Sequence, residues 1–115
     1  MTVLVCGDRN WSSLAAIRRR LRALPPDTVV IEGEARGADT LARVAAQELG
    51  FRVRKFPARW SEYGRAAGPI RNQQMLDAGP DLVLAFHADL AHSKGTADMV
   101  RRATKAGLPV RVYTR

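Results

Sequence analysis

Short apolar runs alternate with longer amphipathic segments along the chain, and this alternation predicts strands and helices in turn. The apolar runs are brief and rich in β-branched residues, as parallel strands buried on both faces are. Five strands are predicted, at residues 3–5, 28–31, 51–56, 81–86 and 110–112. Helices are predicted between them, at residues 13–24, 39–49, 69–78 and 96–106. The longest irregular stretch is predicted at residues 57–68.

Serine, proline and glycine mark the predicted helix boundaries. Ser12 or Ser13 offers an N-cap for the first helix, and Pro25 with Pro26 ends it. Pro69 stands at a predicted first helical position, where its missing N–H costs nothing. The pattern therefore divides cleanly into alternating strands and helices.

Strands that alternate with helices predict an α/β fold with a mostly parallel sheet and right-handed crossovers. We expect a single Rossmann-like domain over residues 1–115, with five strands in the order 3-2-1-4-5 and helices on both faces. In that order the ligand site lies beyond the carboxyl ends of the strands, where the direction of sheet growth reverses. A domain of this size often gains stability from a partner subunit, so a homo-oligomer is left open.

Three glycine-rich and polar clusters follow predicted strands one, two and four, at residues 7–10, 33–39 and 93–96. Glycines let a backbone approach a ligand closely, and the N–H groups at a helix start attract anions. The clusters should converge on one crevice and favour a phosphate-bearing ligand. For residues 33–39 a plain turn with Asp39 as N-cap remains an alternative. Arg71 could bind a phosphate through two hydrogen bonds or be a surface arginine.

The motifs GEARGADTLA, AAGPIRNQQML and KGTADMVRRA together resemble the YspA/YpsA-related branch of the SLOG superfamily. This superfamily also contains the LOG phosphoribohydrolases and the DNA-processing DprA/Smf proteins. The resemblance runs from Val3 to Val110 and implies a Rossmann-like domain that binds a nucleotide or an ADP-ribose-like ligand, as a sensor, a sequestering protein or a weak phosphoribohydrolase. The expected ligand-binding residues are Gly7, Asp8, Arg9, Trp11, Gly33, Glu34, Ala35, Arg36, Gly37, Asp39, Arg71, Asn72, Lys94, Gly95 and Thr96.

Enzyme activity is left open by the same resemblance. LOG enzymes hydrolyse the N-glycosidic bond of nucleoside 5′-monophosphates with a glutamate in a GGxGTxxE motif and an arginine. Gly95 and Thr96 match its GT, but Met99 stands at the glutamate position. If the chain is active, we expect Glu34, Asp98 and Arg71 to carry catalysis. Asp8 and Asp39 are the other candidate carboxylates.

The charge of the chain suggests nucleic acid as an alternative partner. Nineteen Lys and Arg against eleven Asp and Glu give a net charge of +8. However, the arginines of residues 18–22 fall mostly on the solvated face of the first predicted helix. Aromatic residues, which stack on single-stranded bases, are only 6% of the chain. We therefore expect weak, non-specific binding, with a DprA-like single-strand binder as the alternative function.

The remaining aromatic and titratable residues allow narrower expectations. Trp11 could stack on a base or cover the core edge, whereas Trp60 is expected at the core edge. The lone Cys6 is expected to be buried, and His87 and His92 lack the neighbours that a metal site needs. We expect no metal and no cofactor.

Neither a secretory signal pattern nor an apolar run of membrane-spanning length is found. We therefore expect a cytoplasmic protein without membrane contact.

Overall fold

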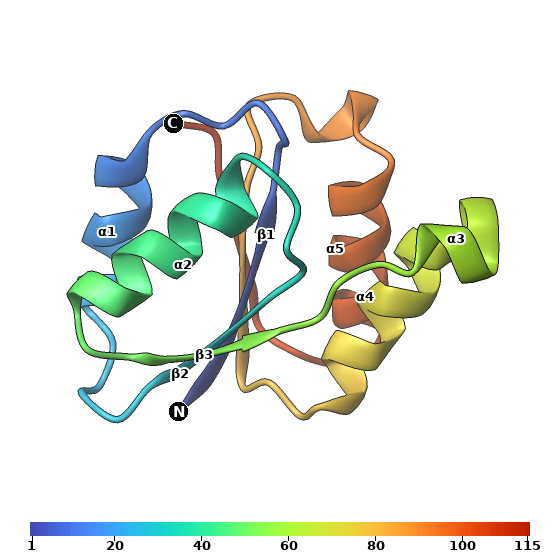
Figure 1. The fold of residues 1–115 in the computed structure, drawn as a ribbon. Coiled ribbons are helices and arrows are strands. Elements are labelled where there is room, and N and C mark those ends of the chain that lie inside the picture. Colours follow the sequence, from blue (N-terminus) through green and yellow to red (C-terminus); the bar gives the residue numbers. More distant parts are fainter.

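A parallel five-stranded sheet lies at the centre of the computed structural model, which describes residues 1–115 (Figure 1). The strand order is β3-β2-β1-β4-β5, and every neighbouring pair is parallel. The strands are β1 (Thr2–Gly7), β2 (Val29–Glu32), β3 (Arg52–Lys55), β4 (Leu82–Phe86) and β5 (Val110–Tyr113). The predicted α/β class, strand number and strand order are therefore confirmed.

Two pairs of helices cover the two faces of the sheet (Figure 1). Helices α1 (Leu14–Arg22) and α2 (Ala38–Glu48) lie on one face. Helices α4 (Ala67–Asp77) and α5 (Gly95–Lys105) lie on the other. No helix is both long and apolar enough to cross a bilayer.

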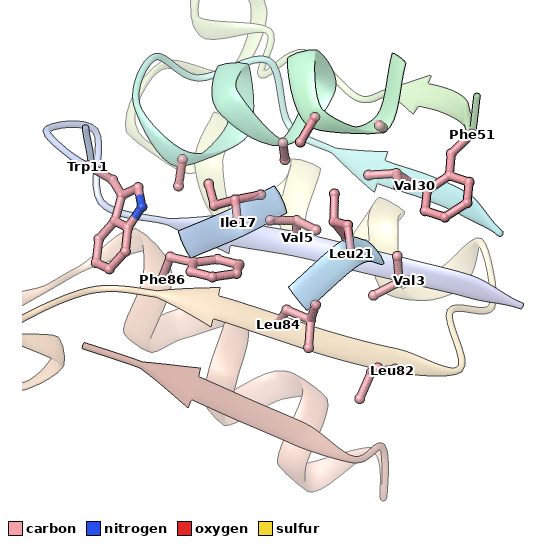
Figure 2. Close-up of a cluster of buried hydrophobic side chains, with 14 residues drawn as sticks. Val3, Val5, Trp11, Ile17, Leu21, Val30, Phe51, Leu82, Leu84 and Phe86 are labelled. Atoms are coloured by element: carbon pink, nitrogen blue, oxygen red, sulfur yellow. The ribbon is translucent and has the colours of Figure 1, made fainter. Parts of the chain in front are cut away.

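Alternation along β1 divides the interior into two cores. Val3 and Val5 enter the 14-residue cluster beneath α1 and α2, which Figure 2 shows, whereas Leu4 and Cys6 enter the cluster beneath α4 and α5. Both faces of the central strands are thus buried, which is why their sequence is a continuous apolar run. The edge strand β3, by contrast, exposes Arg52, Arg54 and Lys55. Charged side chains on an edge discourage pairing with another chain.

The stretch predicted to be irregular is largely helical. It contains the short helix α3 (Trp60–Tyr63), a 3₁₀ turn (Gly64–Ala66) and the start of α4 at Ala67. Pro69 is therefore the third helical residue and not the first. This position is still within the first turn, where backbone N–H groups lack intrahelical partners. In Figure 1, α3 stands beside α4 as the outermost element on that side. A second 3₁₀ turn, Leu90–His92, lies between β4 and α5.

Candidate functional site

The loops after β1, β2 and β4 meet at the carboxyl ends of their strands. The Asp8 amide donates to the Phe86 carbonyl oxygen at 2.9 Å, and the Ala38 amide donates to the Asp8 carbonyl oxygen at 3.1 Å. An added Cβ at Gly7 would lie 2.3 Å from the Phe86 oxygen, so glycine lets the β1 loop pass close to β4. The clusters at residues 7–10 and 33–39 therefore meet as expected, at the point where β1 and β4 pair.

Gly37 and Gly95 stand in different surroundings. Gly37 has a φ of 75°, and an added Cβ would lie 2.3 Å from the Asp8 oxygen and 2.4 Å from the Arg9 oxygen. This glycine therefore lets two protein loops pack, and its space is filled by the protein itself. At Gly95 an added Cβ would meet no atom within 4 Å. Of these two glycines, only Gly95 leaves open space for a ligand.

Arg71, on α4, reaches under the β2 loop. Its Nη1 donates to the Gly33 carbonyl oxygen, and its Nε donates to the Asn72 side-chain oxygen at 3.1 Å. An added Cβ at Gly33 would overlap the Arg71 guanidinium, so a larger residue there would displace Arg71 from this contact. Arg71 is therefore a partly buried group that joins α4 to the β2 loop, and not a freely solvated surface arginine.

Asp39 holds the same loop from its other side. Its Oδ2 accepts the amides of Gly33 and Ala35, each at 3.2 Å. Asp39 lies in the first turn of α2, and Gly37 occupies the N-cap position without a side-chain cap. The alternative of Asp39 as an N-cap is wrong, because its carboxylate points back to the loop.

Burial dominates the electrostatics of Asp39 and Arg71. It raises the pKa of Asp39 to about 6, against the lowering effect of the Ala35 and Gly33 amides and of the Arg71 charge. Burial also lowers the pKa of Arg71; the Asp39 charge opposes this shift, and the Arg9 charge adds to it. The positive charges of Arg9 and Arg71 therefore act on each other at this site, beside the buried Asp39.

Asn72 connects α4 to the start of α5. Its side-chain amide donates to the Gly95 carbonyl oxygen at 3.2 Å and to Asp98 Oδ2 at 3.0 Å. Asp98 also accepts from Arg101 at 3.0 Å and from Arg102 at 2.9 Å. Burial alone would raise the pKa of Asp98, but these hydrogen bonds and charges hold it below its ordinary value. As an ionised, paired group, Asp98 is poorly suited to proton transfer.

The N-terminus of α5 already has a cap. The Ser93 hydroxyl accepts the amide of Thr96 at 3.1 Å and that of Ala97 at 3.3 Å. Thr96 is 5% exposed, whereas Lys94 and Gly95 are open to solvent. A phosphate at this terminus would have to compete with the Ser93 hydroxyl for these two amides.

The remaining carboxylate chosen for catalysis lies on the solvent side of the β2 loop. Glu34 has a positive φ of 57°, and its Oε1 lies 3.8 Å from cationic nitrogens of Arg43 and of Lys55. Arg36, in the same loop, is exposed. Met99, at the position that matches the LOG glutamate, is fully buried among the α4–α5 core residues. The motif position therefore faces the core of this chain.

The two tryptophans differ: Trp11 takes the core alternative that was left open for it, whereas the expectation for Trp60 is wrong. Trp11 is 9% exposed, packs edge-on against Phe86 at 5.6 Å and donates its indole N–H to the Ser13 carbonyl oxygen (Figure 2). Its ring is thus part of the core and is not available to a base. Trp60, expected at the core edge, is 50% exposed.

Cys6 is buried, as the sequence suggests, and each of the two histidines lies near a carboxylate. Cys6 is buried with its Sγ 3.8 Å from the Leu84 oxygen, and burial raises the pKa of its thiol. His87 Nε2 lies 3.9 Å from Asp8 Oδ2, and the exposed His92 pairs with Asp89 at 2.7 Å. The structure holds no group of three or more His, Cys, Asp or Glu side chains with metal-binding geometry.

Glu32 is a buried carboxylate that our sequence reading did not select. It ends β2 with no exposed surface; its Oε2 accepts the Glu34 amide at 2.8 Å, and its Oε1 has no partner. Burial raises its pKa to about 7; the Glu34 amide and the Arg43 charge oppose this shift, and the Asp39 and Glu34 charges add to it. The sequence feature that could have identified Glu32 is a charged residue directly after the apolar run Val29–Val30–Ile31.

Comparisons with known proteins identify a family and support the fold. Residues 1–63 match the model of the YspA, cpYpsA-related SLOG family. The Gene 61 protein of Mycobacterium phage D29 is 39% identical, over 94% of this chain and 92% of its own length. The structure of DNA processing protein A (DprA) from Streptococcus pneumoniae superposes with a TM-score of 0.77 at 19% identity, which shows a shared fold. The match covers 96% of this chain but only 49% of that chain, so our protein spans about half its length. The chain belongs to the YspA, cpYpsA-related family of SLOG proteins.

Proposed function

We propose that this domain binds a nucleotide or nucleotide-derived phosphate ligand at the carboxyl ends of β1, β2 and β4. The observation that carries the proposal is the position of two arginines at these loops. Arg71 donates to the Gly33 carbonyl oxygen beside the buried Asp39, and the exposed Arg9 of the β1 loop adds positive charge near it. A bound anion would be attracted by both charges and accept charge-assisted hydrogen bonds. Family membership and the position of the loops at the point where sheet growth reverses support the same site.

Binding can be tested by calorimetry with AMP, ADP-ribose and inorganic phosphate. Arg9 is exposed, so Arg9→Ala should leave the fold intact. We expect it to weaken AMP binding by about 1.5–3 kcal/mol, the usual cost of losing a charge-assisted hydrogen bond. Arg22→Ala is the matched control, because it removes the same charge from an exposed position on α1. No binding of any of the three ligands, or equal losses in the two variants, would refute the proposed site.

Turnover has less support than binding, because the candidate carboxylates have other partners. Asp98 is paired with Arg101 and Arg102, and Glu34 lies beside Arg43 and Lys55. We therefore propose a sensor or sequestering role, with hydrolysis of the N-glycosidic bond slow or absent. Chromatography of AMP incubated with the protein tests this. Rapid release of adenine would contradict the proposal, and its loss in Glu34→Gln would assign the reaction to that carboxylate.

Single-stranded nucleic acid is a second candidate partner, favoured by the arginines of α1. A groove between α1 and the end of β5 is lined in part by Arg19, Arg20 and Arg115. Two of the α1 arginines are already engaged: Arg18 pairs with Glu48 at 2.9 Å, and Arg20 lies over the Tyr113 ring at 4.2 Å. Exposed, unpaired cations give mainly non-specific attraction that salt weakens.

Fluorescence anisotropy with a labelled single strand separates the two candidates. We expect strand binding to collapse between low and physiological salt, while AMP binding in the partly buried site changes much less. The variant Arg19→Ala/Arg22→Ala should reduce strand binding and leave AMP binding unchanged. Tight strand binding that survives physiological salt and is lost in this variant would make nucleic acid the better-supported partner.

A further inference from the structure

Helix α3 carries an exposed aromatic pair next to the proposed site. Trp60 is 50% exposed and Tyr63, one helical turn later, is 40% exposed, and they are two of the four large hydrophobic side chains exposed on the molecule. A half-exposed indole contributes less to folding than a buried one, because the ring contributes most when it is buried. An exposed ring beside a polar site is available to a ligand, and of this pair Trp60 is the ring that contacts a residue of the proposed site.

Two contacts place the Trp60 ring at the edge of the phosphate site. The Arg9 guanidinium carbon lies 5.9 Å from the ring centroid, within the range of a cation–π contact. The ring also lies against the first turn of α4, since an added Cβ at Gly68 would be 3.4 Å from its Cη2 atom. Arg71 follows Gly68 by one helical turn. The indole therefore contacts both Arg9 and the helix that carries Arg71.

We propose that Trp60 is the stacking platform for the aromatic base of a nucleotide whose phosphate lies at Arg9 and Arg71. This inference rests on the proposed function and names the part of the ligand that the exposed ring recognises. Stacking on a ring face accepts any base, because every base has a π face. Recognition through Trp60 therefore selects nucleotides over sugar phosphates and does not by itself select one base.

A base fits this surface better than a second copy of the chain. The exposed aromatic area consists of two side chains on a four-residue helix, which is small for a stable dimer. Arg9 lies against the Trp60 ring and the exposed Arg65 follows α3 in the chain, whereas Arg59 pairs with Glu62 of α3 at 3.5 Å. Arg9 and Arg65 suit a phosphate-bearing partner and would repel their own copies. Charge complementarity thus favours an anionic, aromatic ligand.

Calorimetry with AMP and ribose 5-phosphate tests the proposal, because the two probes share a phosphate and differ in the base. We expect Trp60→Ala to weaken AMP binding by about five- to 150-fold, the range for loss of one base stack, and to leave ribose 5-phosphate binding unchanged. Trp60→Phe should restore most of the AMP affinity. Tyr63→Ala, which truncates the other exposed ring of α3, is the matched control and should bind AMP as the unmodified protein does.

Each other outcome has a definite meaning. If both probes bind in an Arg9-dependent way and Trp60→Ala changes neither, the stacking proposal is wrong while the phosphate site stands. If neither probe binds the unmodified protein, the proposed function fails, and the stacking proposal fails with it. Equal AMP losses in Trp60→Ala and Tyr63→Ala would assign the effect to α3 as a whole and overturn a specific role for Trp60. A self-association that Trp60→Ala abolishes in sedimentation would assign the ring to a dimer interface.

Discussion

Replacing Glu32 with glutamine should make the stability of the protein depend less on pH between about pH 5 and pH 8. Glu32 is fully buried with one unpartnered oxygen, and burial raises its pKa from 4.5 to about 7. In the unfolded chain the side chain loses its proton near the lower value. Between the two values the folded state holds a proton that the unfolded state has released, so stability falls as pH rises. Above the folded pKa the loss is complete and constant.

The expected size follows from the width of that window. A pKa difference from 4.5 to about 7 corresponds to roughly 3 kcal/mol of stability, at 1.36 kcal/mol per pH unit. Roughly 2 to 3 kcal/mol of this should be lost between about pH 5 and pH 8. Asp39 adds a loss in the same direction, since its pKa is raised from 3.8 to about 6. Because Asp39 is present in both proteins, most of its own loss cancels in the difference between their pH profiles, and what remains is the titration of Glu32 with its coupling to Asp39.

Urea denaturation at a series of pH values measures this difference. The Glu32→Gln profile should fall less steeply than that of the unmodified protein, by the amount given above. The absolute stability at a single pH is less informative than the pH profile. The glutamine side chain would leave a polar group without a partner where Oε1 of Glu32 stands, and this alone lowers stability. Glu62→Gln removes an exposed carboxylate on α3 and controls for the change in net charge. Parallel profiles for Glu32→Gln and the unmodified protein would refute the assignment of a buried, protonated Glu32.

Four further substitutions test other parts of the site by urea denaturation. Gly37→Ala should lower stability by at least about 2 kcal/mol, because Gly37 has a positive φ and lies close to the Asp8 oxygen. Gly95→Ala should leave stability unchanged or raise it by up to about 1 kcal/mol. Equal effects of the two substitutions would contradict the packing of the β1 and β2 loops. Asp98→Asn should lower stability by about 1 to 2 kcal/mol at neutral pH, because it removes the charge that pairs with Arg102. The difference in stability should vanish as pH falls through the lowered pKa of Asp98 in the folded protein. A loss of stability that does not depend on pH would contradict an ionised Asp98. Met99→Glu should destabilise the protein by roughly 3 kcal/mol or more, because it buries an unpaired carboxylate. It should give no hydrolase activity. A stable and active variant would show that residue 99 reaches the crevice.

The sheet could be predicted because its signals are local and repeated. Each central strand is an apolar run between turn residues, and right-handed crossovers leave few orders for five parallel strands. The segment before α4 lacked such a signal. It contains no apolar periodicity long enough to indicate a helix, and α3 is only four residues long. Its helical structure depends on contacts with α4, which the local sequence does not encode.

The individual site residues were harder to predict, because their roles depend on distant contacts. Trp11 and Trp60 both follow predicted strands in polar loops, yet one packs on Phe86 from β4 and the other stays exposed on α3. Gly37 and Gly95 look alike as loop glycines, but only Gly37 lies against the β1 loop. In each pair, the neighbour that decides the role comes from another part of the chain.

The hydrogen bonds of the site divide its residues into a rigid frame and exposed cations. Asp39 and Arg71 fix the β2 loop, and Asn72 fixes the start of α5. These contacts are formed within the protein itself, so a ligand would not have to supply the entropy cost of ordering the loops. The cations that remain exposed around this frame include Arg9, Arg36 and Lys94. We infer that Asp39 and Asn72 set the shape of the site, while the exposed cations and Trp60 choose the ligand. Arg71 belongs to both groups, because it fixes the β2 loop and is proposed to meet the phosphate. Substitutions of the exposed residues should therefore change affinity with little effect on stability, whereas substitution of Arg71 should change both.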